Sequence, residues 1–284
     1  MTSRTAMRVG ALCFAALVAL AGPAMAQSPA SPVQTETVSF ADADPQATQI
    51  ARRMYGQEFS HVRAVRVWLE APSDDPEQLF VELGNDRGCV EGCLQVALFH
   101  NEQWLEIFRQ PRSERLGLTG VTATGMKSII TDDRLWSWNA RNYVPEPSKD
   151  GLTRRDANET ELALVAEQVS GGFDAGDRSA FGPPEVDVYD VDMNGYLGKI
   201  IAVRSPAICG QSTCPVYLVN ADDQIFRVLR SLEGEVGLSR RIRDEQAFRG
   251  IELLTRNGIS IVSSSSGKRL GSVPVQIVRI AGAQ

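Results

Sequence analysis

The sequence predicts an α+β fold that is mainly antiparallel β-sheet, built as a tandem repeat of two similar units that each begin with a helix. The main observation is a stretch that occurs twice. Each copy has an apolar run, a turn containing two cysteines and a returning apolar run, which is the pattern of a β-hairpin. In both copies ten positions separate the start of the first run, Leu79 or Lys199, from the first cysteine, Cys89 or Cys209.

The N-terminus has the composition of a secretory signal peptide. Arg4 and Arg8 precede an apolar run over residues 9–21, and Ala24-Met25-Ala26 supplies small residues for cleavage. The run is too short for a membrane span. We therefore expect residues 1–26 to be removed after Ala26 and the remaining chain to be periplasmic or secreted.

Charge excludes two classes of partner. The chain of 284 residues carries 29 basic and 35 acidic side chains. Without Arg4 and Arg8, the 258 residues after Ala26 carry 27 basic and 35 acidic side chains, a net charge near −8. Such a balance argues against nucleic acid and anionic membrane surfaces as partners.

Helix signals mark the start of each unit. Residues 27–43 are rich in Ser, Pro, Ala and Thr and are expected to be a flexible linker. Asp44 and Pro45 then predict a helix that ends at Gly56. Asn158, followed three residues later by Glu161, predicts the second helix. The first unit is assigned to residues 44–144, a linker to 145–157 and the second unit to 158–284.

Alternating apolar residues predict the strands that follow. In Val65, Val67 and Leu69 the apolar side chains alternate with Arg66 and Trp68, which indicates a half-buried strand. About six antiparallel strands are expected in each unit, and the two units either pack through a shared sheet face or are loosely linked. Further strands are predicted at 104–108, 127–131 and 135–138, and at 186–189, 225–229, 251–255 and 259–262.

The four cysteines that follow the leader form two close pairs. Structural disulfides within each hairpin, Cys89 with Cys93 and Cys209 with Cys214, are the expectation for an exported chain. A redox pair would need Cys-x-x-Cys spacing at a helix N-terminus. A four-cysteine zinc site and bridges between the two units are the remaining alternatives.

Asp190, Asp192, Asn194 and Tyr196 open a segment similar to a calcium-binding loop. Oxygens at its first, third and fifth positions and Gly195 at the sixth suit a hard cation. The pattern then fails, because position twelve is Ile201 rather than a carboxylate. An Asx-rich turn without metal is the alternative.

An aromatic cluster closes the first unit. Trp136 and Trp138 share one face of a predicted strand, and Tyr143 follows. These side chains form either part of the core or a binding platform for sugars or for a protein.

No motif identifies a reaction. A Gly-x-Ser-x-Gly elbow, a phosphate-binding loop and His-Glu-x-x-His are all absent from the sequence, which has only His61 and His100 as histidines. The expectation is therefore a protein without enzymatic activity and without a cofactor, with calcium at the Asp190 segment as the alternative.

The chain resembles a broad group of uncharacterised secreted or periplasmic bacterial proteins with an Asp-rich turn and a cysteine hairpin. The matching pieces are Asp190–Gly195, Cys209–Cys214 and Gly125–Tyr143, and the chain departs from the pattern at Gly198. The resemblance implies an exported β-rich fold and carries no reaction that can be transferred to a residue here.

We expect an exported interaction module that binds an envelope protein through its disulfide-pinned, β-rich surface. Binding of cell-wall or surface glycan through Trp136, Trp138 and Tyr143 is one alternative. A carboxylate-based envelope hydrolase is the other.

Overall fold

The computed structural model describes residues 35–70, 78–85, 89, 92–121, 125–132, 134–169, 182–191, 193, 196–209 and 213–282. The predicted signal peptide lies outside these residues. Residues Gln34–Gln284 form one compact unit. Within the described part of the chain, no helix has the length and hydrophobicity needed to cross a membrane.

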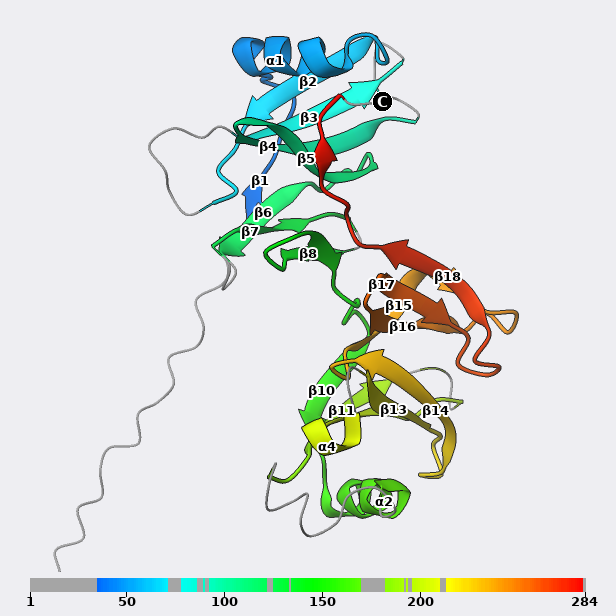
Figure 1. The fold of residues 1–284 in the computed structure, drawn as a ribbon. Helices are drawn as coiled ribbons and strands as arrows, with labels where there is room; N and C mark the ends of the chain where they lie inside the picture. The colour runs from blue at the N-terminus through cyan, green and yellow to red at the C-terminus, as the bar shows by residue number, and fades with distance from the viewer. Residues whose placement is uncertain are drawn as a thin grey trace, which may run out of the picture. The chain divides into compact units, whose positions relative to one another are not determined.

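All strand pairs in the first half of the chain are antiparallel, in two sheets of order β1-β6-β7-β8-β9 and β2-β3-β4-β5 (Figure 1). The elements are β1 (Glu36–Thr37), α1 (Pro45–Tyr55), β2 (His61–Arg66), β3 (Gln78–Gly84), β4 (Leu94–Asn101), β5 (Gln103–Pro111), β6 (Gly117–Val121), β7 (Lys127–Ile130), β8 (Leu135–Trp138) and β9 (Tyr143–Pro145).

The second half has two antiparallel sheets of order β10-β11-β12-β13-β14 and β15-β16-β17-β18. The elements are β10 (Leu152–Asp156), α2 (Glu159–Val169), β11 (Glu185–Val191), β12 (Lys199–Arg204), α4 (Pro206–Cys209), β13 (Thr213–Val219), β14 (Ile225–Leu232), β15 (Val236–Arg243), β16 (Arg249–Thr255), β17 (Gly258–Val262), β18 (Arg269–Pro274) and β19 (Arg279–Ile280).

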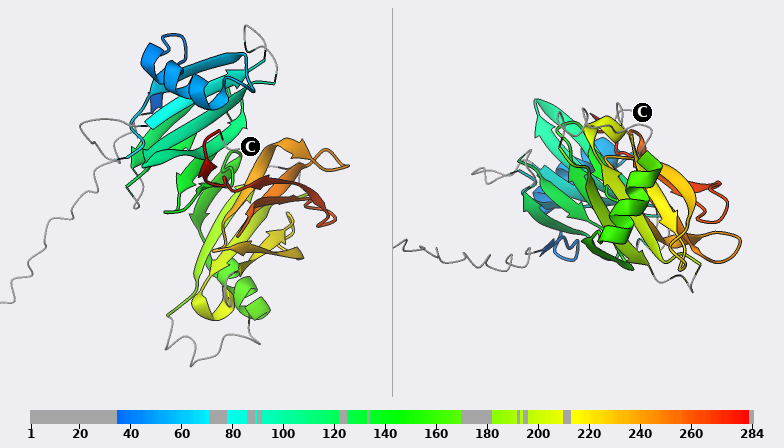
Figure 2. Two further views of the ribbon diagram at one scale, coloured as in Figure 1. Left: turned by 45° about the horizontal axis from the view of Figure 1, so that its top comes forward. Right: turned by 90° about the horizontal axis from the view of Figure 1, so that it is seen from below.

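Each half has a helix, a sheet and a second sheet as successive layers (Figure 2). Ala47, Ala51 and Tyr55 of α1 pack on one face of the β2–β5 sheet. The other face contacts the sheet that contains β6–β9. Val165 of α2 packs in the same way on the sheet that contains β11–β14, whose opposite face contacts the β15–β18 sheet. The mainly antiparallel α+β class is therefore confirmed.

Both predicted helix starts are confirmed by their capping contacts. The Asp44 Oδ1 atom accepts hydrogen bonds from the amides of Gln46 and Ala47 at 2.8 and 2.9 Å. Asn158 and Glu161 form a reciprocal capping box, each side chain accepting from the amide of the other residue at 3.0 Å. Such caps satisfy amides that have no partner inside the helix.

Both segments predicted as linkers contain strands. In the first, β1 pairs with β6, and Val38 and Phe40 are buried in the core. In the second, β10 pairs with β11 along its whole length. These segments have few apolar residues, so periodicity alone does not indicate strands. Ion pairs of Arg154 with Asp187 and of Arg155 with Asp190 hold β10 in place.

The C-terminal strand joins a sheet of the first half. Strand β19 pairs with β5, with Arg279 opposite Glu106 and Ile280 opposite Leu105. The Gln276 amide also donates to the Tyr143 carbonyl at 2.9 Å. The last residues assigned from sequence to the second unit thus complete a sheet of the first, which local sequence patterns do not reveal.

Candidate functional site

Both cysteine pairs form disulfides within their own hairpins, as predicted. Cys89 is bonded to Cys93 between β3 and β4, and Cys209 is bonded to Cys214 between α4 and β13. Bridges between the two halves are thereby excluded. The disulfides are compatible with an oxidising, exported location.

The two helix-covered sheets differ at one edge. Strand β5 is bordered by β4 and β19, whereas β14 pairs with β13 and is the last strand of its sheet. Among the described residues, no backbone hydrogen bond reaches the open side of β14 at Val228 or Arg230. An unpaired strand edge is a template for a further strand.

The pairing register shows which groups face outward. Pro215 pairs with Arg230, but proline has no amide hydrogen, so this is a pair without mutual hydrogen bonds. Hydrogen bonds to β13 therefore come from Leu229 and Ser231. It follows that the N–H and C=O groups of Val228 and Arg230 point away from the sheet.

In the first half, the corresponding edge position on β5 is contacted by another segment of the chain. In both sheets a register shift precedes the outward-facing residue, which is Arg109 in β5 and Val228 in β14. The amide of Arg109 donates to Gln276 Oε1 at 2.9 Å, and Gln276 lies in the extended segment that leads into β19. Among the residues that the structure describes, none supplies a corresponding partner for the amide of Val228.

A pocket of about 410 Å³ lies beside the open edge, on the face of the sheet that carries α2. Most of its lining residues are apolar, but the surface that the pocket exposes is more polar than apolar, and Arg230 supplies a positive charge. Val228 is 52% exposed, which is unusual for a strand valine. The lining residues are Gln168, Val169, Ala207, Ile208, Pro215, Tyr217, Val228 and Arg230.

In the first half the pocket at the end of α1 has a different lining. It measures about 520 Å³ and contains Glu106, Arg109 and Arg279. Glu106 is buried and accepts hydrogen bonds from the Tyr55 hydroxyl and from both arginines at 2.7–2.8 Å. Burial alone would raise the pKa of Glu106, but these hydrogen bonds outweigh it and hold the pKa below its usual value. Glu106 and the two arginines of this pocket are therefore paired with one another.

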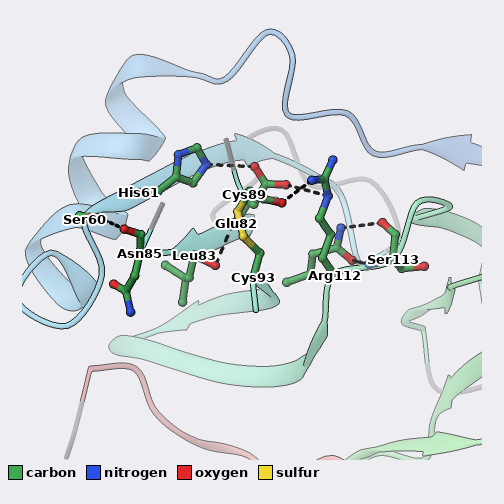
Figure 3. The surroundings of a disulfide bond; sticks show 10 residues. Ser60, His61, Glu82, Leu83, Asn85, Cys89, Cys93, Arg112 and Ser113 are labelled. Atoms are coloured by element: carbon green, nitrogen blue, oxygen red, sulfur yellow. Dashed lines mark hydrogen bonds and ion pairs between the residues drawn. A yellow bond between two sulfur atoms is a disulfide. The ribbon is translucent and has the colours of Figure 1, made fainter. Parts of the chain in front are cut away.

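A second cluster of polar side chains surrounds the first disulfide (Figure 3). His61 Nε2 lies 3.1 Å from Glu82 Oε1, and the Nε atom of Arg112 lies 3.7 Å from Glu82 Oε2. Arg112 also donates to the Cys89 carbonyl at 2.6 Å. A pocket of about 470 Å³ opens onto His61, Glu82 and Arg112.

Of the aromatic residues singled out from the sequence, Trp136 and Tyr143 lie in the core. Trp136 is 5% exposed and Tyr143 is fully buried, while Trp138 is partly buried against the same cluster. Burial raises the pKa of the Tyr143 hydroxyl, which donates to the Lys127 carbonyl at 2.8 Å. This arrangement favours packing over a glycan platform.

The residues of the calcium-like segment are only partly described. Asp192 and Asn194 lie outside the described residues. Asp190 pairs with Arg155 at 2.9 Å, and the Tyr196 ring stacks on Phe248 with centroids 4.8 Å apart. Both described side chains are therefore engaged by other groups of the protein.

The carboxylates that a hydrolase would need are paired as well. Each buried acidic side chain in the described part of the chain forms an ion pair with a basic residue, and these acids are Glu82, Glu106, Glu161, Asp187 and Glu252.

Sequence reasoning did not find the β14 edge or the His61–Glu82 pair. Both depend on contacts between distant residues, since His61 and Glu82 are 21 positions apart. Pro215 directly after Cys214 was the one local signal at the edge, because a proline limits how its strand can pair.

Comparison of the chain with family models, with curated proteins and with solved structures found no match.

Proposed function

We propose that this chain is an exported, non-enzymatic interaction module that binds an extended segment of an envelope protein by strand addition to β14. The observation that carries the proposal is the open edge at Val228 and Arg230 beside a pocket of mixed polar and apolar lining. In strand addition, main-chain hydrogen bonds provide affinity and pockets for alternate side chains provide specificity.

The first half supplies the template for the bound state. There an extended segment from a distant part of the chain lies along β5 and caps the amide of Arg109. A partner bound to β14 would contact the amide of Val228 in the same manner. Its apolar side chain would enter the pocket, and an acidic one would pair with Arg230.

The other edge strands suit this role less well. The outer side of β2 is bonded at Ala64 to Asp44 and Thr48, and that of β15 at Leu238 to the Ser148 carbonyl. Strand β18 begins with Arg269 and ends with Pro274.

Strands β1 and β9 are short, with two and three residues. Strand β10 carries Arg154, Arg155 and Asp156 within five residues. Charged side chains on an edge discourage the addition of another strand.

We also propose that the two halves of the chain are repeats of one unit and that the chain is exported. The order helix, four-stranded meander with a cysteine hairpin after its second strand, and second four-stranded meander occurs in both halves, which supports two copies of one ancestral unit. The N-terminal sequence pattern of residues 1–26 and the two disulfides support export.

Crosslinking at the edge tests the function. A photo-crosslinking phenylalanine analogue is placed at position 228 of the full chain in its native host, and at the exposed Thr153 of β10 as the matched control. We expect one envelope protein to be crosslinked from position 228 alone, through a single extended segment. Two results would contradict the proposal. One is crosslinking to many proteins in proportion to their abundance, and the other is crosslinking only to a second copy of this chain.

Substitution at the same residue tests the binding mode. Val228→Pro removes the outward amide hydrogen, whereas Val228→Thr keeps it together with the branched shape. Loss of about one hydrogen bond corresponds to roughly tenfold weaker binding. We expect Val228→Pro to weaken binding of the crosslinked segment, measured with a labelled synthetic peptide, and Val228→Thr to bind nearly as the native chain does. Equal affinities would exclude strand addition here.

A further inference from the structure

The first disulfide lies next to two side chains that can bind metals. One ligand atom each of His61, Glu82 and Cys89 lie within 4.8 Å of one another. Glu82 and Cys89 are buried, and the His61 side chain is only 12% exposed. Figure 3 shows the imidazole and the carboxylate on the same side of the hairpin as the sulfurs.

With the disulfide intact, this centre has a nitrogen and an oxygen donor but no thiolate. Opening the disulfide would release two sulfur donors. The Cys89 sulfur belongs to the cluster and the Cys93 sulfur is bonded to it, and pairing of Leu83 with Leu94 keeps their strands together. One nitrogen, one carboxylate oxygen and two thiolates form a donor set that suits tetrahedral Zn²⁺.

We propose that the reduced Cys89–Cys93 pair, together with His61 and Glu82, forms a redox-gated site for a thiophilic divalent cation such as Zn²⁺. A dithiol reductant opens the site, giving two electrons and two protons to the disulfide and becoming a disulfide itself. Binding of the cation then releases the two thiol protons. A disulfide oxidant then takes two electrons from the two thiolates and becomes a dithiol, which restores the Cys89–Cys93 bond and expels the metal.

Several features of the surroundings fit this cycle. The pocket of about 470 Å³ gives an ion a path to His61 and Glu82. The Arg112 Nε atom forms an ion pair with Glu82 at 3.7 Å, which is longer than a hydrogen bond, so a bound cation competes only with this longer contact for the carboxylate. Loss of so short a disulfide loop costs only about 2 kcal/mol in the chain-entropy model, which leaves the sheet to hold the reduced site together.

The second disulfide supplies a control inside the same chain. The Cys209 sulfur has the Ser205 amide and the Val203 carbonyl as neighbours. In the described part of the chain, no histidine or carboxylate joins Cys209 and Cys214 in a ligand cluster. The two pairs thus differ in the one feature on which the site depends.

Cobalt(II) titration of the full mature chain tests the site. The protein is reduced with a phosphine, which does not compete as a dithiol ligand would, and Co²⁺ is added as the probe. We expect one Co²⁺ per chain with thiolate-to-cobalt charge-transfer absorption, displaced by Zn²⁺, and no such absorption for the oxidised protein. Absence of the absorption in the reduced protein, with circular dichroism showing that the sheets persist, would overturn the proposal.

Variants assign the ligands. His61→Asn and Glu82→Gln are each expected to weaken Co²⁺ binding roughly tenfold or more, in line with the usual cost of perturbing a metal centre. The double variant Cys209→Ser/Cys214→Ser should bind as the native chain does. Loss of binding in that double variant, with native binding in His61→Asn and Glu82→Gln, would assign the metal to the other cysteine pair and overturn the proposal.

Discussion

Glu252→Ala is expected to destabilise the protein by about 3–5 kcal/mol, the usual cost of leaving one partner of a buried ion pair alone. Glu252 is fully buried and accepts hydrogen bonds from both terminal nitrogens of Arg134 and from the Ser148 amide, at 2.8–3.0 Å. The substitution leaves the Arg134 guanidinium, only 6% exposed, without its counter-ion.

Urea unfolding measures this effect, with Glu235→Ala as the matched control. Glu235 pairs with Lys149 at 2.9 Å, but both side chains are partly exposed, and such pairs contribute only about 0–1 kcal/mol. The double change Arg134→Met/Glu252→Leu should recover much of the lost stability, because no buried charge remains. A Glu252→Ala midpoint equal to that of Glu235→Ala would contradict the account of this ion pair.

Acid is expected to destabilise the native chain through Glu161 by about 3 kcal/mol. Hydrogen bonds from Arg155, chiefly, and from the Asn158 amide and Lys199 lower the pKa of this buried carboxyl from 4.5 to about 2. The folded state therefore favours the ionised form. The contribution is complete above the unfolded pKa and is lost as the pH falls from about 4.5 through about 2.

Chemical unfolding over this pH range compares the native chain with Glu161→Gln. The free energy of unfolding of the native chain, relative to that of Glu161→Gln, should fall by about 3 kcal/mol between roughly pH 6 and pH 2. Glu159→Gln, which removes an exposed carboxylate from the same turn of α2, is the matched control. If the difference in free energy of unfolding between the native chain and Glu161→Gln does not change with pH, the ion pairs of Glu161 do not cause the loss of stability in acid.

The sequence predicted those parts of the fold that depend on local chemistry. Asp44, Asn158 and Glu161 identified both helix starts, because a capping side chain and the groups that it bonds lie within four residues of each other in the sequence. Cysteine spacing predicted both disulfides. The closing strand at 135–138 was predicted with its observed bounds, because its residues are strongly β-forming.

The remaining features depend on distant partners. Strand β10 is held by ion pairs to β11, and β19 occupies the edge of β5 from the far end of the chain. Gln276 and Arg109 are 167 positions apart, so the occupied edge in the first half has no local signal. The open edge of β14 follows from the strand order and from the pairing register, neither of which has a local sequence signal apart from Pro215.

Amide hydrogen exchange along β14, measured residue by residue by NMR, tests the central claim most directly. In the free protein, the amides of Val228 and Arg230 should exchange rapidly, and those of Leu229 and Ser231 slowly, because only the latter pair bonds to β13. Addition of the bound segment should protect Val228 and Arg230. Slow exchange at all four amides in the free protein, or protection elsewhere on binding, would contradict strand addition at this edge.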